Sequence, residues 1–86
     1  MIIKFSKTFK KQYEKIPKEI REVFKEKMTI FLENEFSAIL RNHKLHGEYS
    51  DFRSINITGD YRLVYKKESE TVILLIAIGT HAKLYK

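Results

Sequence analysis

The sequence of 86 residues contains no cysteine, one proline and three glycines. The lack of cysteine excludes disulfide bonds and thiolate metal ligands, and it suits a reducing compartment. The scarcity of proline and glycine leaves little room for linkers, so we expect one small domain. The glycines also lie too far apart to form a glycine-rich phosphate-binding loop.

Long apolar runs are absent as well. No run approaches the roughly 20 residues that span a bilayer, and the first residues lack the apolar region and cleavage site of a signal peptide. We therefore expect a cytoplasmic protein with no membrane partner. Hydrophobic residues nevertheless make up 43% of the chain, which is sufficient for a packed core.

The chain is basic, because 17 lysines and arginines oppose 11 aspartates and glutamates and give a formal net charge of +6. A field of this sign attracts polyanions and speeds their encounter with the protein. The same excess also keeps a small domain soluble. Charge alone therefore does not separate a nucleic-acid-binding protein from a basic protein that binds nothing anionic.

The N-terminal half predicts a short strand followed by two helices. Residues 1–5 have strand composition, and Ser6 is suited to cap a first helix. Pro17 suits the first turn of a second helix that reaches about Asn34. Apolar residues recur with helical spacing along both, which predicts an antiparallel helix pair laid over a sheet. The expected buried stripe of the second helix comprises Ile20, Val23, Phe24 and Phe31, with Met28 and Ile30 beside it.

The segment 33–50 loses the helical period and predicts a connection. We expect Phe36, Ile39 and Leu40 to anchor it to the core, and Leu45 to pin a loop over residues 42–47. Loops positioned by a rigid scaffold often carry function.

A β-hairpin is predicted over residues 51–67, with its turn at residues 58–60. Gly59 can adopt a positive φ there. Because side chains alternate along a strand, Arg62 and Val64 should share one face, and their Tyr and Leu neighbours the other. One face can then pack on the core while the other holds charge toward a ligand.

The nearly apolar run 71–79 predicts a central strand covered on both faces, and the last residues predict one helical turn or an extended tail. The expected fold class is therefore α+β. Its order is β-α-α-β-β-β, with two N-terminal helices packed on a mostly antiparallel four-stranded sheet.

The three histidines, His43, His46 and His81, are candidates for proton transfer. Imidazole titrates near neutral pH, so one histidine can accept a proton while another donates one. No cysteine or carboxylate ligand pattern accompanies them, and no serine nucleophile elbow is present. We therefore expect no metal and no cofactor.

Ribonuclease chemistry suits these residue types. The 2′-hydroxyl of RNA is already tethered to the neighbouring phosphate, so an enzyme needs a base, an acid and a cation. A guanidinium such as that of Arg62 would stabilise charge on a phosphoryl oxygen. The residues alone leave open the alternative that these histidines are simply solvated.

Four patterns in the C-terminal half occur in order: His43-x-Leu45-x-Gly47, residues 52–57 (FRSINI), residues 59–65 (GDYRLVY) and residues 78–85 (IGTHAKLY). Together they resemble the RelE/ParE toxin superfamily, and most of all the YafQ-like (RelE/StbE) mRNA interferases. The resemblance implies a RelE-like fold in a single domain, 1–86. It implies a toxin of a type II toxin–antitoxin system that cuts mRNA in the ribosomal A site, with a cognate antitoxin, mRNA and the ribosome as partners.

The resemblance also implies a site. His43 or Asp60 would take the proton of the 2′-hydroxyl, and His81 would protonate the leaving 5′-oxygen. Arg62 would bind the phosphate, and Tyr85 would stack on the nucleotide or orient it. The residues expected to bind the neighbouring RNA are Lys44, Arg53, Asn56 and Lys83.

The chain departs from the family pattern in the strand before the turn, where Ser54 and Asn56 replace Asp and His. Asn56 can hydrogen-bond a phosphate or a base, but it cannot transfer a proton at neutral pH. Arg53 and Arg62 are therefore expected to carry more of the electrostatic work.

Two other functions remain open. A ParE-like gyrase inhibitor from the same superfamily would need no acid–base groups. A non-catalytic RNA- or ribosome-binding module would bind in a salt-sensitive way without cutting.

Overall fold

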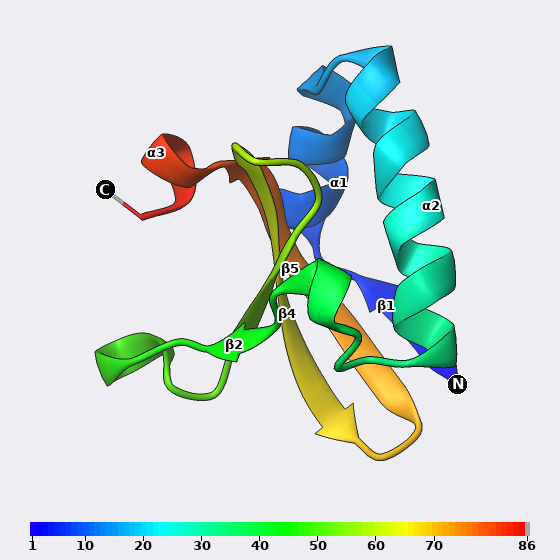
Figure 1. Cartoon of the computed structure of the whole chain (residues 1–86). Helices are drawn as coiled ribbons and strands as arrows, with labels where there is room; N and C mark the ends of the chain where they lie inside the picture. The colour runs from blue at the N-terminus through cyan, green and yellow to red at the C-terminus, as the bar shows by residue number, and fades with distance from the viewer. Residues whose placement is uncertain (86) are drawn as a thin grey trace.

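The computed structural model describes residues 1–85, with two long helices on one side of a sheet (Figure 1). The elements, in chain order, are β1 (Ile2–Phe5), α1 (Lys7–Lys15), α2 (Lys18–Glu33), the 3₁₀ turn η1 (Ala38–Leu40), β2 (His43–Lys44), the 3₁₀ turn η2 (Gly47–Tyr49), β3 (Arg53–Asn56), β4 (Tyr61–Ser69), β5 (Val72–Thr80) and α3 (His81–Leu84).

The sheet has the strand order β1-β5-β4-β3-β2, in which β1 pairs in parallel with β5 and the other neighbours are antiparallel. The α+β class and the mostly antiparallel sheet are confirmed. The expected count of four strands is wrong, because His43 and Lys44 pair with Ser54 and Arg53 and form a fifth. The predicted loop over residues 42–47 is therefore strand at these two positions. The apolar run forms β5, an interior strand, but β4 lies at the centre.

Local signals begin and end the two long helices. The Ser6 hydroxyl accepts a hydrogen bond from the Phe9 N–H at 2.9 Å, which confirms the predicted cap. The same hydroxyl donates to the carbonyl of Ile76 in β5 at 2.7 Å, so the start of α1 is fixed to the sheet. Pro17 caps α2 from outside and is not its first helical residue.

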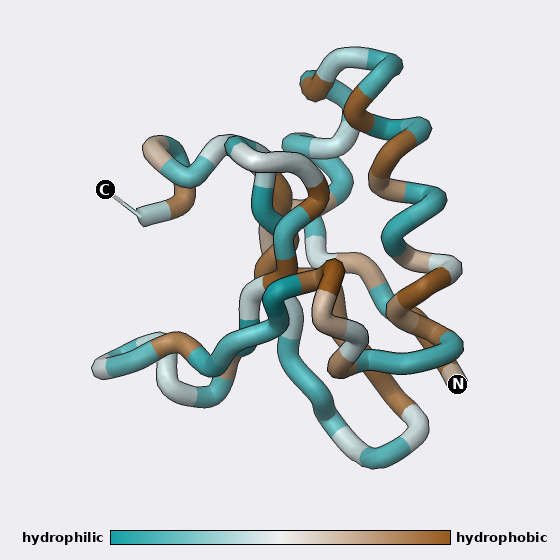
Figure 2. The backbone as a smooth tube through the Cα atoms, viewed as in Figure 1, coloured by the Kyte–Doolittle hydropathy of each residue, from teal (hydrophilic) through white to brown (hydrophobic). Residues whose placement is uncertain are grey.

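The core lies between the helix pair and the sheet, and hydrophobic and hydrophilic residues alternate along α2 (Figure 2). Of the predicted stripe, Phe24 and Phe31 are buried, whereas Ile20 and Val23 are only half-buried. Met28, expected beside the stripe, is buried in it. The sheet contributes Ile55, Ile57, Leu63, Tyr65, Ile73, Leu75 and Ile78.

The connection between α2 and β2 has one apolar anchor. Leu40 is fully buried, but Phe36 and Ile39 are 60% and 55% exposed, so their predicted role as anchors is wrong. Leu45 is half-buried, and its N–H donates to the Phe52 carbonyl at 3.0 Å. That bond continues the pairing of β2 with β3.

The opposite face of the sheet carries a smaller apolar cluster beneath α3. A cavity there is lined by Leu45, Phe52, Val64, Ile76 and Leu84, among others. This face of β5 is covered only in part, since Leu74 and Ile76 are half-buried, so the prediction of a strand covered on both faces holds for one face.

The hairpin between β3 and β4 turns differently from the prediction. The Thr58 hydroxyl accepts from the N–H groups of Asp60 and Tyr61 at 3.2 and 3.0 Å. Gly59 does not adopt a positive φ, whereas Gly47 does, at 65°. Within residues 1–85, no helix has the length and apolar character that a membrane crossing requires.

Candidate functional site

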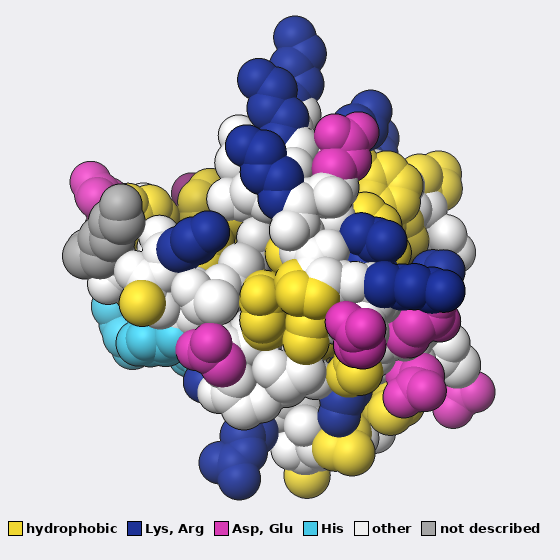
Figure 3. All heavy atoms as spheres, turned by 90° about the horizontal axis from the view of Figure 1, so that it is seen from above, with side chains coloured by type: hydrophobic (Ala, Val, Ile, Leu, Met, Phe, Trp, Pro, Cys, Tyr) yellow, Lys and Arg dark blue, Asp and Glu magenta, His cyan; other side chains and the backbone are white. Residues whose placement is uncertain are grey.

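A pocket of about 450 Å³ opens on the side of the sheet away from α1 and α2. In Figure 3, histidine side chains gather at the left edge of the molecule, the side on which α3 and β2 lie in Figure 1. The connection before β2, three strands and α3 all contribute to the pocket. Its lining residues are Arg41, His43, Leu45, Asn56, Arg62, His81 and Tyr85.

His43 stands on β2 with one ring nitrogen already engaged. Its Nδ1 lies 3.0 Å from the carbonyl oxygen of Arg41. A carbonyl only accepts, so Nδ1 must carry the proton of the neutral imidazole. The Nε2 nitrogen is then unprotonated and available as a base.

Arg62 is held by the turn that precedes it. Its Nη1 donates to the carbonyls of Thr58 and Gly59 at 3.0 and 2.8 Å. Within the described chain, Nε and Nη2 make no hydrogen bond, so the turn orients the guanidinium without using its whole donor set. The remaining donors and the positive charge are available to an anion in the pocket.

His81, the first residue of α3, and Tyr85, the residue that follows α3, both line the pocket. The backbone N–H of His81 donates to the carbonyl of Asp60 at 2.9 Å, which joins the start of α3 to the hairpin turn. The rings of His81 and Tyr85 lie 4.8 Å apart between centroids. The Tyr85 hydroxyl donates to Ser54 Oγ, which is fully buried in β3, at 2.7 Å.

The end of β5 lies against α3 at Gly79. A Cβ at this position would stand 3.4 Å from a methyl carbon of Leu84, which is van der Waals contact. Leu84 of α3 therefore packs directly over Gly79.

Five of the nine predicted site residues line this pocket: His43, Asn56, Arg62, His81 and Tyr85. His81 and Arg62 therefore lie on the same side of the sheet, as a shared phosphate requires. Within residues 1–85, no three histidine, aspartate or glutamate side chains are grouped as metal ligands.

The other four predicted residues lie elsewhere. Asp60 is exposed in the turn, and its backbone carbonyl, not its carboxylate, contacts α3. Lys44 is exposed on β2, and Lys83 lines a smaller cavity against α1. Arg53 stands on the opposite side from Asn56 because alternate residues of β3 face opposite ways.

Arg41 is the lining residue that the sequence motifs missed. It ends η1 in the left-handed region, with φ 49° and ψ 43°. The available signal was a basic residue two positions before His43. Ser54 also differs from its expected role: the sequence marks it only as a departure from the family pattern and does not predict its hydrogen bond to Tyr85.

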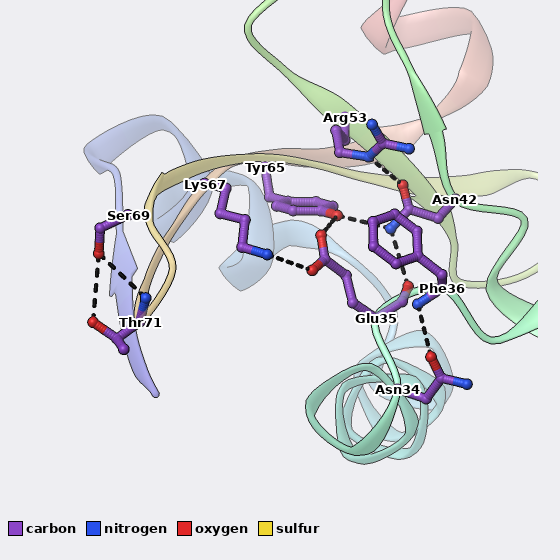
Figure 4. A network of polar contacts seen from close by, with 9 residues as sticks. All are labelled: Asn34, Glu35, Phe36, Asn42, Arg53, Tyr65, Lys67, Ser69 and Thr71. Atoms are coloured by element: carbon purple, nitrogen blue, oxygen red, sulfur yellow. Dashed lines mark hydrogen bonds and ion pairs between the residues drawn. The ribbon is translucent and has the colours of Figure 1, made fainter.

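A polar network on the helix side of the sheet holds the connection that carries Arg41 and His43 (Figure 4). The Tyr65 hydroxyl donates to Glu35 Oε2 at 2.6 Å and accepts from Asn42 Nδ2 at 2.7 Å. The same Asn42 nitrogen donates to the Glu35 carbonyl at 3.0 Å. Because Asn42 lies between the two pocket residues in the chain, the network fixes the backbone from which both extend.

Charged groups complete the network. Lys67 Nζ lies 3.0 Å from Glu35 Oε1, and Arg53 Nε donates to Asn42 Oδ1 at 2.8 Å. Arg53 also lies 5.1 Å from the centre of the Phe36 ring. Burial raises the pKa of Glu35, but the hydrogen bonds from Tyr65 and Lys67 and the nearby positive charges outweigh it and lower the pKa below its usual value. Burial and the bond to Glu35 raise the pKa of Tyr65.

Comparison with known proteins gives one family. The sequence profile described as "Bacterial toxin of type II toxin-antitoxin system, YafQ" matches residues 1–86. No curated protein sequence matches the chain significantly.

Several solved structures share the fold. YafQ from E. coli strain BL21(DE3) is 24% identical, with a TM-score of 0.83 over 98% of this chain and 97% of that one. YafQ in the E. coli DinJ–YafQ toxin–antitoxin complex is 25% identical, with a TM-score of 0.80 over 98% and 96%. A YoeB/ParE toxin from Agrobacterium tumefaciens is 19% identical, with a TM-score of 0.80 over 94% and 99%.

Proposed function

The chain belongs to the YafQ family of bacterial toxins of type II toxin–antitoxin systems, and from that premise we propose that it is an endoribonuclease. Its substrate is mRNA in the ribosomal A site in the cytoplasm, and the reaction uses neither a metal nor another cofactor. The observation that supports the proposal is that two imidazoles, two guanidinium groups and a tyrosine line one pocket.

The reaction begins at the 2′-hydroxyl of the nucleotide before the cut. His43 Nε2 takes its proton, for which the hydrogen bond from Nδ1 to Arg41 leaves that nitrogen free. The 2′-oxygen then forms a bond to phosphorus. Arg62 stabilises the negative charge that grows on the non-bridging oxygens, since it lines the pocket and its Nε and Nη2 make no hydrogen bond within residues 1–85.

The bond from phosphorus to the 5′-oxygen breaks as His81 donates a proton to that oxygen. The products are a 2′,3′-cyclic phosphate and a 5′-hydroxyl end. Tyr85 stacks on the nucleotide, and Asn56 hydrogen-bonds a phosphate or a base. His43, and not Asp60, is the proposed base because the Asp60 carboxylate does not line the pocket.

A cognate antitoxin is the proposed protein partner. The related E. coli YafQ forms a complex with the antitoxin DinJ. A chain with a net charge of +6 is suited to capture by an acidic segment, which would cover the pocket and exclude RNA.

The test is cleavage of mRNA on translating ribosomes, with the new 5′ ends mapped and their hydroxyl groups identified. His81→Ala and Arg62→Ala should each lower the cleavage rate by about 10²- to 10⁴-fold. Lys25→Gln, which removes one positive charge from α2 on the other side of the sheet, serves as the control and should cut at the normal rate. Where the protein also cuts naked RNA, excess EDTA should leave that cleavage unchanged, because the proposed reaction uses no metal.

Full cleavage by both site variants would refute the assignment of these residues. Intact mRNA together with inhibited DNA supercoiling would replace the nuclease with a gyrase inhibitor. Salt-sensitive binding to ribosomes without new RNA ends would show that the protein is a non-catalytic binding module.

A further inference from the structure

We propose that Arg41 is a substrate-binding residue that holds the phosphate on the 5′ side of the cleaved nucleotide. The proposal rests on the proposed ribonuclease function of the same pocket and adds a second phosphate subsite to it. Neither the family patterns in the sequence nor the comparisons assign a role to this residue.

The backbone of Arg41 is the first argument. Within residues 1–85 it is the one residue other than glycine with a positive φ, at 49°. In this region the Cβ of an L-residue crowds the backbone, and glycine, asparagine or aspartate is accommodated with less strain. Strained residues of this kind persist where their surroundings hold them, and they gather at binding sites.

The surroundings hold this conformation from both sides. The N–H of Arg41 donates to the Ala38 carbonyl at 3.2 Å, and its own carbonyl receives Nδ1 of His43. The next residue, Asn42, is fixed by bonds to Glu35 and Tyr65. The backbone is thus set before any ligand arrives, and it directs the Arg41 side chain to the wall of the pocket.

The charge of Arg41 is the second argument. Its side chain is exposed, and within the described residues it makes neither an ion pair nor a hydrogen bond. Arg41 and Arg62 are therefore two guanidinium groups on one pocket with donors to spare. The pocket has about the volume of fifteen water molecules in the liquid, more than one phosphate group needs.

The positions of the two arginines assign their phosphates. Arg62 is fixed to the turn whose Asp60 carbonyl also holds His81, so it lies on the side of the proposed acid. Arg41 adjoins His43, the proposed base, through its carbonyl. The base acts on the 2′-hydroxyl of the nucleotide before the cut. That nucleotide has the scissile phosphate on its 3′ side and a second phosphate on its 5′ side. Because Arg62 binds the scissile phosphate, the phosphate assigned to Arg41 is the 5′-phosphate.

The test uses a dinucleotide with a 2′-O-methyl group on its first sugar, which blocks cleavage, prepared with and without a 5′-phosphate. Binding is followed by NMR titration of the protein. For the unmodified protein the 5′-phosphate should strengthen binding by about tenfold, as expected for one charge-assisted contact. Arg41→Asn, which tolerates the left-handed region, should lose this gain, and Arg41→Lys should keep part of it.

Two controls make the result specific. Lys25→Gln should keep the full gain, which excludes a general effect of net charge. A phosphate placed at the 3′ end instead should strengthen binding equally in the unmodified protein and in Arg41→Asn. Arg41→Asn should melt at or above the temperature of the unmodified protein, because asparagine is less strained in the left-handed region, and its His43 ring signals should be retained. A lost gain then reflects the guanidinium and not the fold.

The proposal is overturned if the 5′-phosphate strengthens binding to Arg41→Asn as much as it strengthens binding to the unmodified protein. It is also overturned if the unmodified protein does not bind the dinucleotide. The measurement needs no cleavage, so it stays separate from the ribosome assay. If mRNA is cut but the gain persists in Arg41→Asn, the subsite is wrong and the nuclease stands. If the gain is lost but no RNA is cut, the phosphate contact stands without the nuclease.

Discussion

The hydroxyl of Tyr65 ties the connection between α2 and β2 to the sheet, and its removal should destabilise the fold. It donates to Glu35 Oε2 at 2.6 Å and accepts from Asn42 Nδ2 at 2.7 Å (Figure 4). The ring is fully buried and packs edge-on against Phe31, with centroids 5.0 Å apart. Because phenylalanine fills the same space, Tyr65→Phe removes the two hydrogen bonds and little else.

The magnitude follows from those two bonds. A hydrogen bond to a charged group contributes about 1.5 to 3 kcal/mol, and a neutral one about 0.5 to 1.5 kcal/mol. Glu35 keeps its ion pair with Lys67 at 3.0 Å, so its carboxylate is not left alone. We therefore expect Tyr65→Phe to lower the free energy of unfolding by about 2 to 3 kcal/mol. For a domain of this size, the melting temperature should fall by about 10 to 20 °C.

Urea denaturation followed by circular dichroism measures this free energy directly. Tyr13→Phe is the matched control, because Tyr13 packs against Phe9 and Phe24 while its hydroxyl makes no hydrogen bond within residues 1–85. The control should stay within about 0.5 kcal/mol of the unmodified protein. An equally small change in Tyr65→Phe would show that the network contributes nothing to stability, and the reasoning would be wrong.

Three further predictions concern stability. The pKa of Glu35 is lower in the folded protein than in the unfolded chain. The Glu35 carboxylate therefore stabilises the fold fully above the pKa of the unfolded chain, and this stabilisation is lost as the pH falls through the pKa of the folded protein. The difference in unfolding free energy between the unmodified protein and Glu35→Gln should therefore narrow below about pH 4, and a constant difference from pH 7 to pH 3 would contradict this. Ser54→Ala and Tyr85→Phe each break the same 2.7 Å hydrogen bond, so a double-mutant cycle in urea should show a coupling of about 1 kcal/mol, whereas additive losses would exclude the bond. Arg41→Gly relieves the left-handed strain and should raise the free energy of unfolding by about 1 kcal/mol; a lower melting temperature would refute the strain.

The helices could be predicted from the sequence because their signals are local. Ser6 caps α1, and the spacing of Phe24 and Phe31 gives the buried face of α2. Strand β2 has no such signal. Two polar residues, His43 and Lys44, become strand only because β3 lies beside them. Neither segment alone predicts this pairing, because it joins residues that are separated in the sequence.

The residues of the candidate site likewise fall into those that the sequence predicts and those that it does not. Sequence motifs named His43, Arg62, His81 and Tyr85, and the structure brings these four to one pocket. Arg53 could have been placed by alternation, since it shares a face with Ile55, a core residue. Arg41 could not, because its place in the pocket depends on a left-handed backbone that no residue type in the segment specifies.

Three side chains of the pocket are held by bonds that leave free the groups assigned to the proposed reaction. His43 is fixed through Nδ1, which leaves Nε2; Arg62 is fixed through Nη1, which leaves two other nitrogens. Tyr85 is fixed through its hydroxyl, which leaves the face of the ring. Catalytic groups that are oriented before the substrate arrives need little reorganisation in the transition state, and that is the condition under which charge and proton transfer are most effective. For the proposed ribonuclease, Ser54 should affect the rate of cleavage without contacting RNA, because it holds the Tyr85 hydroxyl and so determines where the stacking ring lies.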